Sequence, residues 1–366
     1  FVISQITGMI DRGHEVRIFS NRLVRQNIQH KSIEQYGLLD KTVVVPQVPR
    51  NPLKRLVPAL KGLLGAMKRR RLGAAVKALS IVRFGRRSLG LSLFIRATGN
   101  YEPVAFDVIH CQFGHLGVMV QELRECGAIS GSLVTSFRGA DVMRYASSEP
   151  ERFSGLFASG EQFLAVSSII KDRLAELGCP ADRTQVLRSG IDLGRFKQRQ
   201  LRNPGDVVRL ISVGRLAPNK GVEVALEAVK ILGNAGKNVH FRVLGAGPCE
   251  SSLHEQVREL GIEAAVTFEG AVDSDRVIEA LNESDILLAP TTSGLHGDQE
   301  GLPNCLKEAM AIGVVAVGSE MGSIPELITD GENGFLVEQR DAPALAEAVE
   351  KIIENWGGMA QVVAEA

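Results

Sequence analysis

The sequence predicts an α/β protein with two domains, each built on a doubly wound parallel sheet. The chain has 366 residues, which is enough for two domains of ordinary size. Hydrophobic residues make up 45% of it and aromatic residues only 5%, as expected for Val/Ile/Leu strands packed between Ala/Leu helices. Short apolar runs alternate with segments of helical period, which is the pattern of βα units around parallel sheets.

Short apolar runs mark the predicted strands in each half of the chain. In the first half they cover 16–20, 42–45, 108–111, 133–137, 163–166 and 185–188. In the second half they cover 210–213, 239–244, 266–268, 286–289, 314–317 and 335–337. The segment 197–206 is polar, lacks a pattern and contains Pro and Gly, so it is predicted to be a linker. Domains are therefore expected at 1–198 and 207–366, with a ligand-binding cleft at the carboxyl ends of both sheets.

Composition and cysteine spacing narrow the class of protein further. The 42 Lys and Arg balance the 42 Asp and Glu, so the net charge is zero. The five cysteines have no zinc-ligand or CxxC spacing, which indicates free thiols in a reducing cytoplasm. No apolar run reaches the roughly 18 residues of a transmembrane helix, so no membrane span is expected. Because the chain opens and closes inside amphipathic patterns, we expect both ends to be truncated, with the first strand missing before Phe1.

The segment 300–308 holds two carboxylates eight positions apart. It follows the predicted strand 286–289 and a polar loop, and it leads into a helix in which Pro303 is expected at the first position and which Gly313 ends. The free N–H groups of a helix N-terminus favour an anion such as a phosphate. Glu308 lies roughly 7 Å farther along this helix, at 1.5 Å per residue. One diphosphate-bridged ligand could therefore contact Glu300 at one end and Glu308 at the other.

Two cations lie in a loop after the first predicted strand of the second half. Arg215 and Lys220 are five residues apart between Gly214 and Gly221, at the expected carboxyl edge of a sheet. A guanidinium can bind phosphate oxygens in a fork and an ammonium can act as a mobile point charge, so the pair suits a diphosphate. The alternative is two solvated loop cations.

Two other motifs are interpreted as structural. The run 245–250 resembles a dinucleotide fingerprint, but Glu250 replaces its third glycine, so we predict a tight strand–helix turn near a nucleotide and no NAD site. Asp273 and Asp275 precede a helical pattern, where a helix N-cap explains Asp273 or Ser274 better than a metal does. No metal site is predicted.

Taken together, these motifs resemble the group 1 (family 4) retaining glycosyltransferases. The resemblance rests on Glu300 and Glu308 with seven residues between them, on the loop 214–221, on the turn 245–248 and on the run 322–337. In the first half the segments 12–16, 166–168 and 190–196 agree. The motifs cover nearly the whole chain in the family's order and spacing. Segments 109–114 and 137–141 resemble enzymes of exopolysaccharide or colanic acid assembly more specifically.

The resemblance implies the GT-B fold, in which two Rossmann-like doubly wound domains face a central cleft. It also implies transfer with retention, usually drawn as front-face attack by the acceptor hydroxyl while the leaving phosphate takes its proton. No metal or other cofactor is implied, because protein cations and a helix N-terminus neutralise the departing nucleoside diphosphate. In the donor site, the resemblance implies that Arg215 and Lys220 bind the diphosphate, Glu308 the ribose and Glu300 the transferred sugar. The backbone of Gly301, Leu302, Pro303 and Asn304 is expected to close on the sugar and phosphate. Gly245 and Gly247 are expected near the nucleotide.

Two positions depart from the family's pattern. Members commonly carry a second histidine two residues after the one that matches His110, and here that residue is Gln112. Together with Glu300, both are candidate catalytic residues, although a single histidine at a strand end can equally be a packed residue. Where the family has TxHGxD, this chain has Arg138 in place of the histidine, followed by Asp141. Arg138 could bind an anionic acceptor phosphate or pair with a nearby carboxylate, and His115 is a further acceptor-side candidate.

A basic stretch at 50–96 is the other informative region. From 41 to 100 there are fourteen Lys and Arg and no Asp or Glu, and leucines are interleaved at roughly helical spacing. This composition is typical of helices that lie on an anionic membrane, where each cation contributes about 1 kcal/mol. A solvated helical face is the alternative. Nucleic acid is not expected, because aromatic residues for stacking are sparse. A helical insertion at about 50–97 of the first domain is therefore predicted.

The sequence thus predicts a glycosyltransferase that moves a sugar from a nucleotide donor to a saccharide or polyprenyl-diphosphate-linked acceptor. Its expected location is the cytoplasm, peripherally on the inner face of the cytoplasmic membrane. Two alternatives stay open: a nucleotide-sugar epimerase or hydrolase on the same fold, and a non-catalytic membrane-associated subunit, which Gln112 and Arg138 make plausible.

Overall fold

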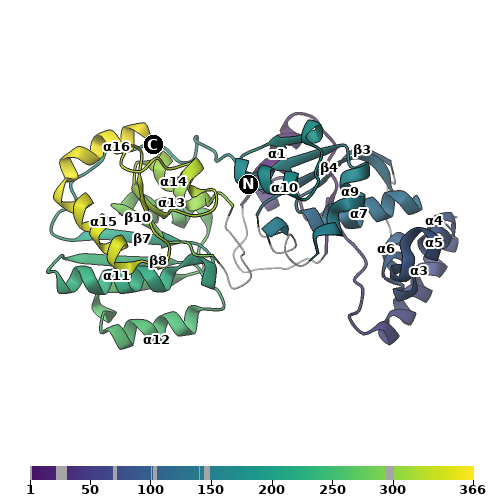
Figure 1. The fold of residues 1–366 in the computed structure, drawn as a ribbon, viewed down its shortest axis with the longest axis horizontal. Coiled ribbons are helices and arrows are strands. Elements are labelled where there is room, and N and C mark those ends of the chain that lie inside the picture. The colour runs from purple at the N-terminus through teal and green to yellow at the C-terminus, as the bar shows by residue number, and fades with distance from the viewer. Residues whose placement is uncertain are drawn as a thin grey trace. The chain divides into compact units, whose positions relative to one another are not determined.

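The computed structural model describes residues 2–21, 31–68, 72–99, 101, 105–139, 141–143, 149–293 and 301–366. These residues form two units (Figure 1). The first draws its described residues from 1–141, 148–165 and 174–185, and the second from 142–147, 166–173 and 186–366. The segment 186–198, predicted to close the first domain, therefore groups with the second unit.

A six-stranded sheet forms the centre of the second unit (Figure 1). Its strands are β7 (Val208–Val213), β8 (Val239–Leu244), β9 (Val266–Gly270), β10 (Ile286–Ala289), β11 (Val315–Ser319) and β12 (Phe335–Val337). Neighbouring strands are parallel and follow the order β12-β11-β10-β7-β8-β9. This is the order of the dinucleotide-binding doubly wound fold, in which the chain reverses direction across the sheet between the first and fourth strands, here β7 and β10.

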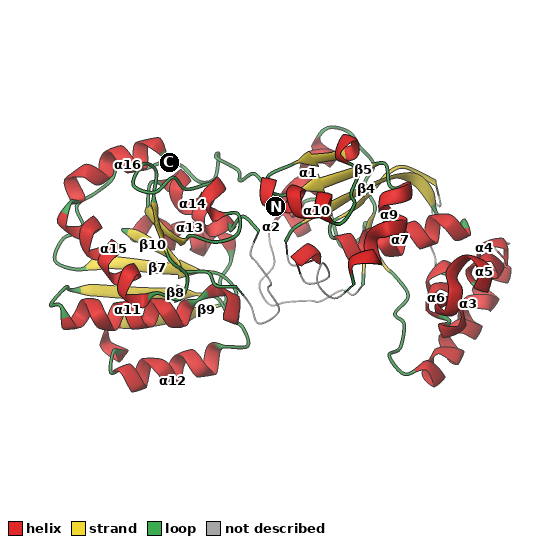
Figure 2. Cartoon of the chain, viewed as in Figure 1, coloured by secondary structure: helices red, strands yellow, loops and turns green. Residues whose placement is uncertain are grey.

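Helices cover both faces of this sheet, because neighbouring residues of a strand point to opposite sides. Leu210 and Ile286 pack with α11 (Val222–Asn234), α12 (Glu250–Leu260), α15 (Ala342–Glu354) and α16 (Met359–Glu365). Ile211 and Leu287, one residue farther along, pack with α13 (Ser274–Glu283) and α14 (Asn304–Ile312). Strands buried on both faces explain why these runs are almost continuously apolar. Figure 2 shows the strands enclosed by helices.

The N-terminal half of the chain contains smaller parallel sheets. The strands β1 (Ile18–Ser20) and β2 (Thr42–Val44) form one pair, and β3 (Ala105–Cys111), β4 (Ser130–Phe137), β5 (Gln162–Ala165) and β6 (Thr184–Val186) form a second sheet in that order. Phe137 on β4 packs edge-on against Phe153, with ring centroids 5.5 Å apart, at the centre of this core. The accompanying helices are α1 (Val2–Asp11), α2 (Lys31–Gln35), α7 (Gly114–Cys126), α9 (Ser154–Ser159) and α10 (Ser168–Glu176).

The basic stretch forms a group of helices between β2 and β3. It comprises the 3-10 turn η1 (Pro52–Arg55), α3 (Leu56–Lys68), α4 (Leu72–Ala78), α5 (Ile81–Phe84), the 3-10 turn η2 (Gly85–Gly90) and α6 (Ser92–Ala97). The α6 helix buries Leu93, Phe94 and Ile95. By contrast, α3 buries only Ala59 and Ala66, and most of its larger apolar side chains are exposed, namely Leu56, Val57, Leu60, Leu64 and Met67.

The predicted strands are confirmed, since each has a counterpart in the structure. The bounds of β8, β10 and β12 match, whereas β3 and β4 begin three residues earlier than predicted, at Ala105 and Ser130. None of the five cysteines forms a disulfide in the structure. No helix of the described residues is both long and apolar enough to cross a membrane.

The predicted linker 197–206 contains no helix or strand and is fastened to the second unit. The Arg199 N–H donates to the Ile312 carbonyl at 2.8 Å, and the Trp356 indole N–H donates to the Arg202 carbonyl at 3.0 Å. The Arg202 guanidinium also lies 3.7 Å from Asp285, which is buried. These contacts explain why the segment groups with the second unit.

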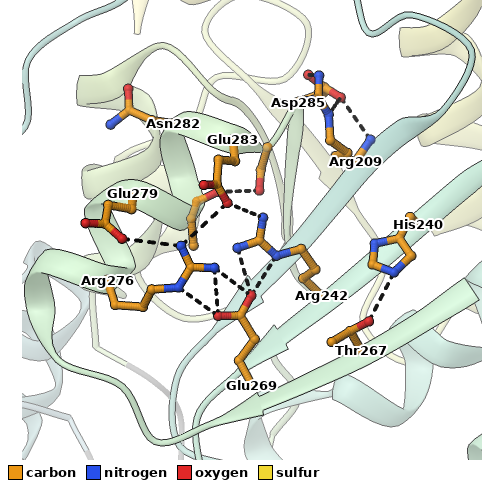
Figure 3. Close-up of polar contacts among 12 residues, drawn as sticks. Arg209, His240, Arg242, Thr267, Glu269, Arg276, Glu279, Asn282, Glu283 and Asp285 are labelled. Carbon is orange, nitrogen blue, oxygen red and sulfur yellow. Dashed lines mark hydrogen bonds and ion pairs between the residues drawn. The ribbon is translucent and has the colours of Figure 1, made fainter.

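An ion-pair network fixes α13 to the edge of the six-stranded sheet of the second unit (Figure 3). Glu269 on β9 binds Arg242 of β8 at 2.8 Å and Arg276 of α13 at 3.0 Å, and Glu283 accepts from Arg242 at 2.8 Å. At the start of α13, the Asp273 carboxylate accepts from the Arg276 backbone N–H at 2.8 Å. Asp273 is therefore the predicted N-cap, and its role is structural.

Candidate functional site

A pocket opens in the second unit where the strands β7 and β10 end. It lies at the switch point of the sheet, which is where doubly wound proteins bind their ligands. Its lining residues come from β7, β8 and β10, from the loops that follow β7 and β10, and from the start of α14. They are Ser212, Val213, Gly214, Arg215, Leu216, Lys220, Val222, Val243, Leu244, Leu288, Ala289, Thr291, Pro303 and Cys305.

Glycines let the loops around this pocket approach one another through their backbones. A Cβ on Gly221, whose φ is +65°, would overlap the carbonyl oxygen of Pro290 in the loop after β10. A Cβ on Gly245 would likewise overlap the carbonyl oxygen of Gly214. Only glycine combines the missing Cβ with this backbone conformation at no steric cost. The position of the cation-bearing loop therefore depends on backbone contacts with two neighbouring loops.

The positive charges of the loop reach this pocket together. Arg215 is exposed and Lys220 is partly buried, and both line it. Val222 and Pro303, at the starts of α11 and α14, line it as well. Neither N-cap residue, Gly221 of α11 or Pro303 of α14, makes a side-chain cap. Two cations and two helix N-termini make this pocket suited to an anion.

The helix α14 differs in one respect from the prediction. Pro303 is its N-cap, since ψ is 128° there, and the first helical residue is Asn304. Placing Pro303 at the first helical position was wrong by one residue. Gly313 ends the helix in the left-handed conformation, as predicted. Gly301 and Leu302 precede the helix as partly buried loop residues, whereas Glu300 lies outside the described residues.

Glu308 lies one turn into α14 and does not itself line the pocket. It is partly buried, and this burial raises the pKa of its carboxyl, while Lys307 and Arg195 act to lower it. The Lys307 ammonium donates to the Ser189 carbonyl at 2.6 Å, which fixes this side of the helix. A carboxylate held in partly desolvated surroundings is suited to accept hydrogen bonds from a ligand's hydroxyl groups.

The run 245–250 is a tight strand–helix turn, as predicted. It joins β8, which ends at Leu244, to α12, which begins at Glu250. A Cβ on Gly247 would overlap the Leu216 carbonyl oxygen, and the Leu216 N–H donates to the Ala246 carbonyl at 3.1 Å. Gly245 and Gly247 therefore bring this turn against the loop that carries Arg215.

The candidate residues of the first unit gather where β3 and β4 end. The His110 imidazole, at the end of β3, lies 2.7 Å from the Ser136 hydroxyl on β4. Although His110 is an exposed residue, the desolvation of its ring lowers its pKa, and the charge of Arg138 lowers it further. His110 is therefore a hydrogen-bonded histidine whose surroundings favour the neutral form.

The two residues that depart from the family's pattern contact each other. The Arg138 guanidinium donates to the Gln112 backbone carbonyl at 3.1 Å and to its side-chain oxygen. The Gln112 amide in turn donates to Gln5 on α1 at 3.3 Å. The catalytic candidate Gln112 and the acceptor-side candidate Arg138 thus form one polar cluster.

Asp141 holds this cluster in place. Its buried carboxylate accepts from the backbone N–H of Gly114 at 2.7 Å and from that of Arg138 at 3.0 Å, which ties the loop after β4 to the start of α7. Burial raises the pKa of Asp141, and these donors only partly oppose the rise. His115, the second residue of α7, stacks on Phe113 with ring centroids 5.7 Å apart, and burial lowers its pKa.

Three polar residues that line the pocket were not predicted: Ser212, Thr291 and Cys305. Thr291 carries a usable signal, because it follows Pro290 directly after an apolar run, where the carboxyl end of a parallel strand lies. Cys305 falls inside the segment 300–308, in which the two carboxylates are the stronger signal. A single serine inside a strand such as Ser212 carries no such signal.

Comparison with known proteins gives one family and several relatives. The family model described as glycosyl transferases group 1 matches residues 195–366. WcaL of Salmonella typhimurium LT2, assigned as a glycosyltransferase of colanic acid biosynthesis, is 36% identical over 349 residues, which are 94% of this chain and 85% of that protein. The amylovoran biosynthesis glycosyltransferase AmsK of Erwinia amylovora is 32% identical over 369 residues, covering 99% of this chain and 89% of AmsK.

A solved structure shows the same fold. Anabaena Alr3699/HepE in complex with UDP and glucose superimposes with a TM-score of 0.62 at 18% identity, covering 78% of this chain and 77% of that one. At this identity the likeness concerns the fold alone. It confirms the predicted class, an α/β protein of the GT-B type with Rossmann-like parallel sheets.

Proposed function

Because the chain belongs to the group 1 glycosyltransferases, we propose that it transfers a sugar from a nucleotide diphosphate donor to a saccharide or lipid-linked acceptor of a cell-surface polysaccharide. The names of WcaL and AmsK, which match nearly the whole chain, support the pathway class. The complex of HepE with UDP and glucose supports the donor class.

One observation carries the assignment of the donor site. Arg215 and Lys220 line the pocket at the switch point, beside the N-termini of α11 and α14. Guanidinium, ammonium and backbone N–H groups all stabilise a diphosphate. They also stabilise the charge that develops on the leaving phosphate oxygen as the sugar departs. The proposal therefore includes no resident metal or other cofactor.

The remaining donor contacts follow from the direction of α14. A diphosphate at its N-terminus places the nucleoside along the helix toward Glu308, to which we assign the ribose hydroxyls. Glu300 is assigned to the transferred sugar, and the backbone of residues 301–304 to closure over sugar and phosphate. Gly245 and Gly247 are placed near the nucleotide, because their turn packs on the loop that carries Arg215.

The proposed transfer retains the configuration of the sugar. The acceptor oxygen attacks C1 from the face that the leaving phosphate vacates. The C1–phosphate bond breaks, the new glycosidic bond forms, and the acceptor proton passes to the leaving phosphate. His110 and Gln112 are assigned to hydroxyl groups of the sugar, for which a neutral imidazole and an amide are suitable partners.

A thermal-shift panel of nucleotide diphosphate sugars tests the donor assignment. At least one of them should raise the unfolding temperature by mass action. The absence of any shift across uridine, guanosine and adenosine sugars would contradict the proposal. Incubating the active donor without acceptor then separates the alternatives, since release of free or epimerised sugar at full rate would identify a hydrolase or an epimerase.

For the acceptor, we assign Arg138 to an anionic group such as a lipid-linked phosphate. Its guanidinium is partly buried and oriented by Gln112, while its backbone N–H is bound to Asp141. Asp141 acts here as a positioning residue, and His115 on the adjoining turn of α7 completes the acceptor side. Arg138→Lys keeps the charge but loses the fork, so the KM for a phosphate-linked acceptor should rise about tenfold. An unchanged KM would remove Arg138 from the acceptor site.

We further propose that α3 places the enzyme peripherally on the cytoplasmic face of an anionic membrane. Apolar side chains at helical spacing are 53–78% exposed on η1 and α3, namely Leu53, Leu56, Val57, Leu60, Leu64 and Met67. Lys54, Lys61 and Lys68 are exposed at seven-residue intervals along the same segment. An apolar face flanked by cations, with no carboxylate between 41 and 100, matches an anionic lipid surface in both polarity and charge.

Flotation with lipid vesicles tests this surface. The wild-type chain should float with vesicles containing phosphatidylglycerol and stay behind with pure phosphatidylcholine. Leu56→Glu combined with Leu60→Glu should abolish flotation, because it places charges on the apolar face. Leu193→Glu, at an equally exposed leucine of the second unit, is the matched control and should float normally. Normal flotation of the double variant would contradict the proposal.

A further inference from the structure

The Thr291 hydroxyl is a buried polar group in the donor pocket that none of the proposed ligand contacts involves. Thr291 follows β10, is only 2% exposed and lines the pocket together with Arg215 and Lys220. Its Oγ1 atom has no hydrogen-bond partner among the residues that the structure describes. Its backbone N–H is satisfied by the Ala289 carbonyl at 2.8 Å, so only the hydroxyl lacks a partner.

Two neighbouring hydroxyl groups, those of Ser212 and Thr292, are occupied. Ser212, which also lines the pocket, donates to the Leu288 carbonyl at 2.6 Å. Thr292 donates to the Pro218 carbonyl at 3.1 Å, so it ties the loop after β10 to the cation-bearing loop. Leaving a buried hydroxyl unpaired costs free energy, and native proteins rarely retain such groups without a ligand or water to satisfy them. Thr291 therefore differs from Ser212 and Thr292 in that its hydroxyl has no partner among the described residues.

We infer that the Thr291 hydroxyl donates a hydrogen bond to a phosphate oxygen of the donor diphosphate. This inference rests on the proposed function, which places that diphosphate in this pocket. The pocket brings Thr291 together with two cations and two helix N-termini, all of which favour an oxyanion. A phosphate oxygen is an acceptor only, so the partner it requires from Thr291 is the O–H donor that the unliganded protein leaves unused.

Binding measurements on Thr291→Val and Thr291→Ser test the inference. Valine keeps the shape and removes the hydroxyl, whereas serine keeps the hydroxyl. Calorimetry with UDP, GDP and inorganic pyrophosphate should show binding to Thr291→Val weakened by about tenfold or more, as for loss of a hydrogen bond to a charged group. Thr291→Ser should bind close to wild type. Without ligand, Thr291→Val should unfold at the wild-type temperature or slightly above it, because an unsatisfied buried hydroxyl has been removed.

Ser319→Ala is the matched control. Ser319 ends β11 in the same sheet, is fully buried and also has no hydroxyl partner in the described part of the chain, but it does not line the pocket. Its substitution should leave binding of all three probes unchanged. Weakened binding of UDP with unchanged binding of pyrophosphate would assign Thr291 to the nucleoside and overturn its assignment to phosphate.

The outcomes separate the inference from the proposed function. If wild type binds the probes and Thr291→Val binds them equally well, the inference fails alone and the donor site stands. If wild type binds neither a nucleoside diphosphate nor pyrophosphate, both fail. If Thr291→Val does not fold, wild-type affinity in Thr291→Ser with weakened binding in Thr291→Ala supports the hydroxyl, and unchanged binding in Thr291→Ala overturns it.

Discussion

The carboxyl edges of the two parallel sheets are built in different ways. In the second unit, loops meet through their backbones, with Gly221 against Pro290 and Gly245 against Gly214. In the first unit, the corresponding edge is joined by side chains, since Arg138 binds Gln112 and Asp141 binds two backbone N–H groups. A close approach of two backbones admits only glycine, whereas one pair of interacting side chains can be replaced by another pair. Gln112 and Arg138, the two positions that depart from the family's pattern, both lie at the edge that side chains join.

Gly221→Ala is the strongest way to test the backbone-built edge. The new methyl would overlap the Pro290 carbonyl in a positive-φ conformation, so the loop must move. We expect a loss of about 3 kcal/mol or more in the free energy of unfolding and no detectable UDP binding. Denaturant unfolding and calorimetry measure the two effects.

Gly236→Ala is the control for this prediction. Its φ of +75° is similar, but a Cβ there meets nothing within 4 Å. It should cost only about 1 kcal/mol, from backbone strain alone, and leave UDP binding intact. Equal effects of the two substitutions would show that the close approach of the loops is not what holds the site.

Lys220→Ala tests the charge that the loop carries. Because the backbone contacts of the loop remain, the fold should persist while affinity for UDP and pyrophosphate falls about 100-fold and transfer is lost. Lys351→Ala removes a cation of the same unit that pairs with Glu347 on the surface of α15, and it should change binding little. Unimpaired transfer by Lys220→Ala would remove this residue from the site.

Glu308→Gln separates the ribose contact from the phosphate contacts. Affinity for UDP should fall about tenfold, whereas affinity for pyrophosphate, which has no ribose, should stay unchanged. A parallel loss of pyrophosphate binding would place Glu308 at the diphosphate instead.

The pH dependence of stability provides a second measurement on this variant. Burial raises the pKa of Glu308, so ionisation of this carboxyl destabilises the unliganded protein above the ordinary glutamate range near pH 4.3. Glu308→Gln should therefore be more stable than wild type at pH 7 and equally stable below about pH 4. A variant that is less stable at pH 7 would contradict the raised pKa.

The sequence predicts the strands of the structure more completely than it predicts the contacts between loops. Strand β10 is buried and apolar along its whole length, and β8 alternates buried apolar residues with His240 and Arg242, so both patterns predicted the strand ends. The starts of β3 and β4 were missed, because Asp107 interrupts the apolar run of β3 and the residues 130–132 of β4 are small or polar. Arg215 and Lys220 were found because one short loop holds both. The contact between Gln112 and Arg138 joins two loops and depends on the register of β3 and β4, which aligns His110 with Val134 and is not encoded locally.

A double-mutant cycle on Gln112 and Arg138 gives the smallest expected effect and tests the side-chain-built edge directly. Gln112→Ala, Arg138→Ala and the double variant should show a coupling of about 1 kcal/mol in unfolding free energy, because each single variant removes the hydrogen bond between the Arg138 guanidinium and the Gln112 side-chain oxygen. Arg124, which binds Glu161 instead, supplies the control: Gln112→Ala and Arg124→Ala should be additive. Additivity in the first cycle would mean that the pair does not act as a unit. Coupling there, with a raised acceptor KM in each single variant, would mean that the side-chain pair itself shapes the acceptor side.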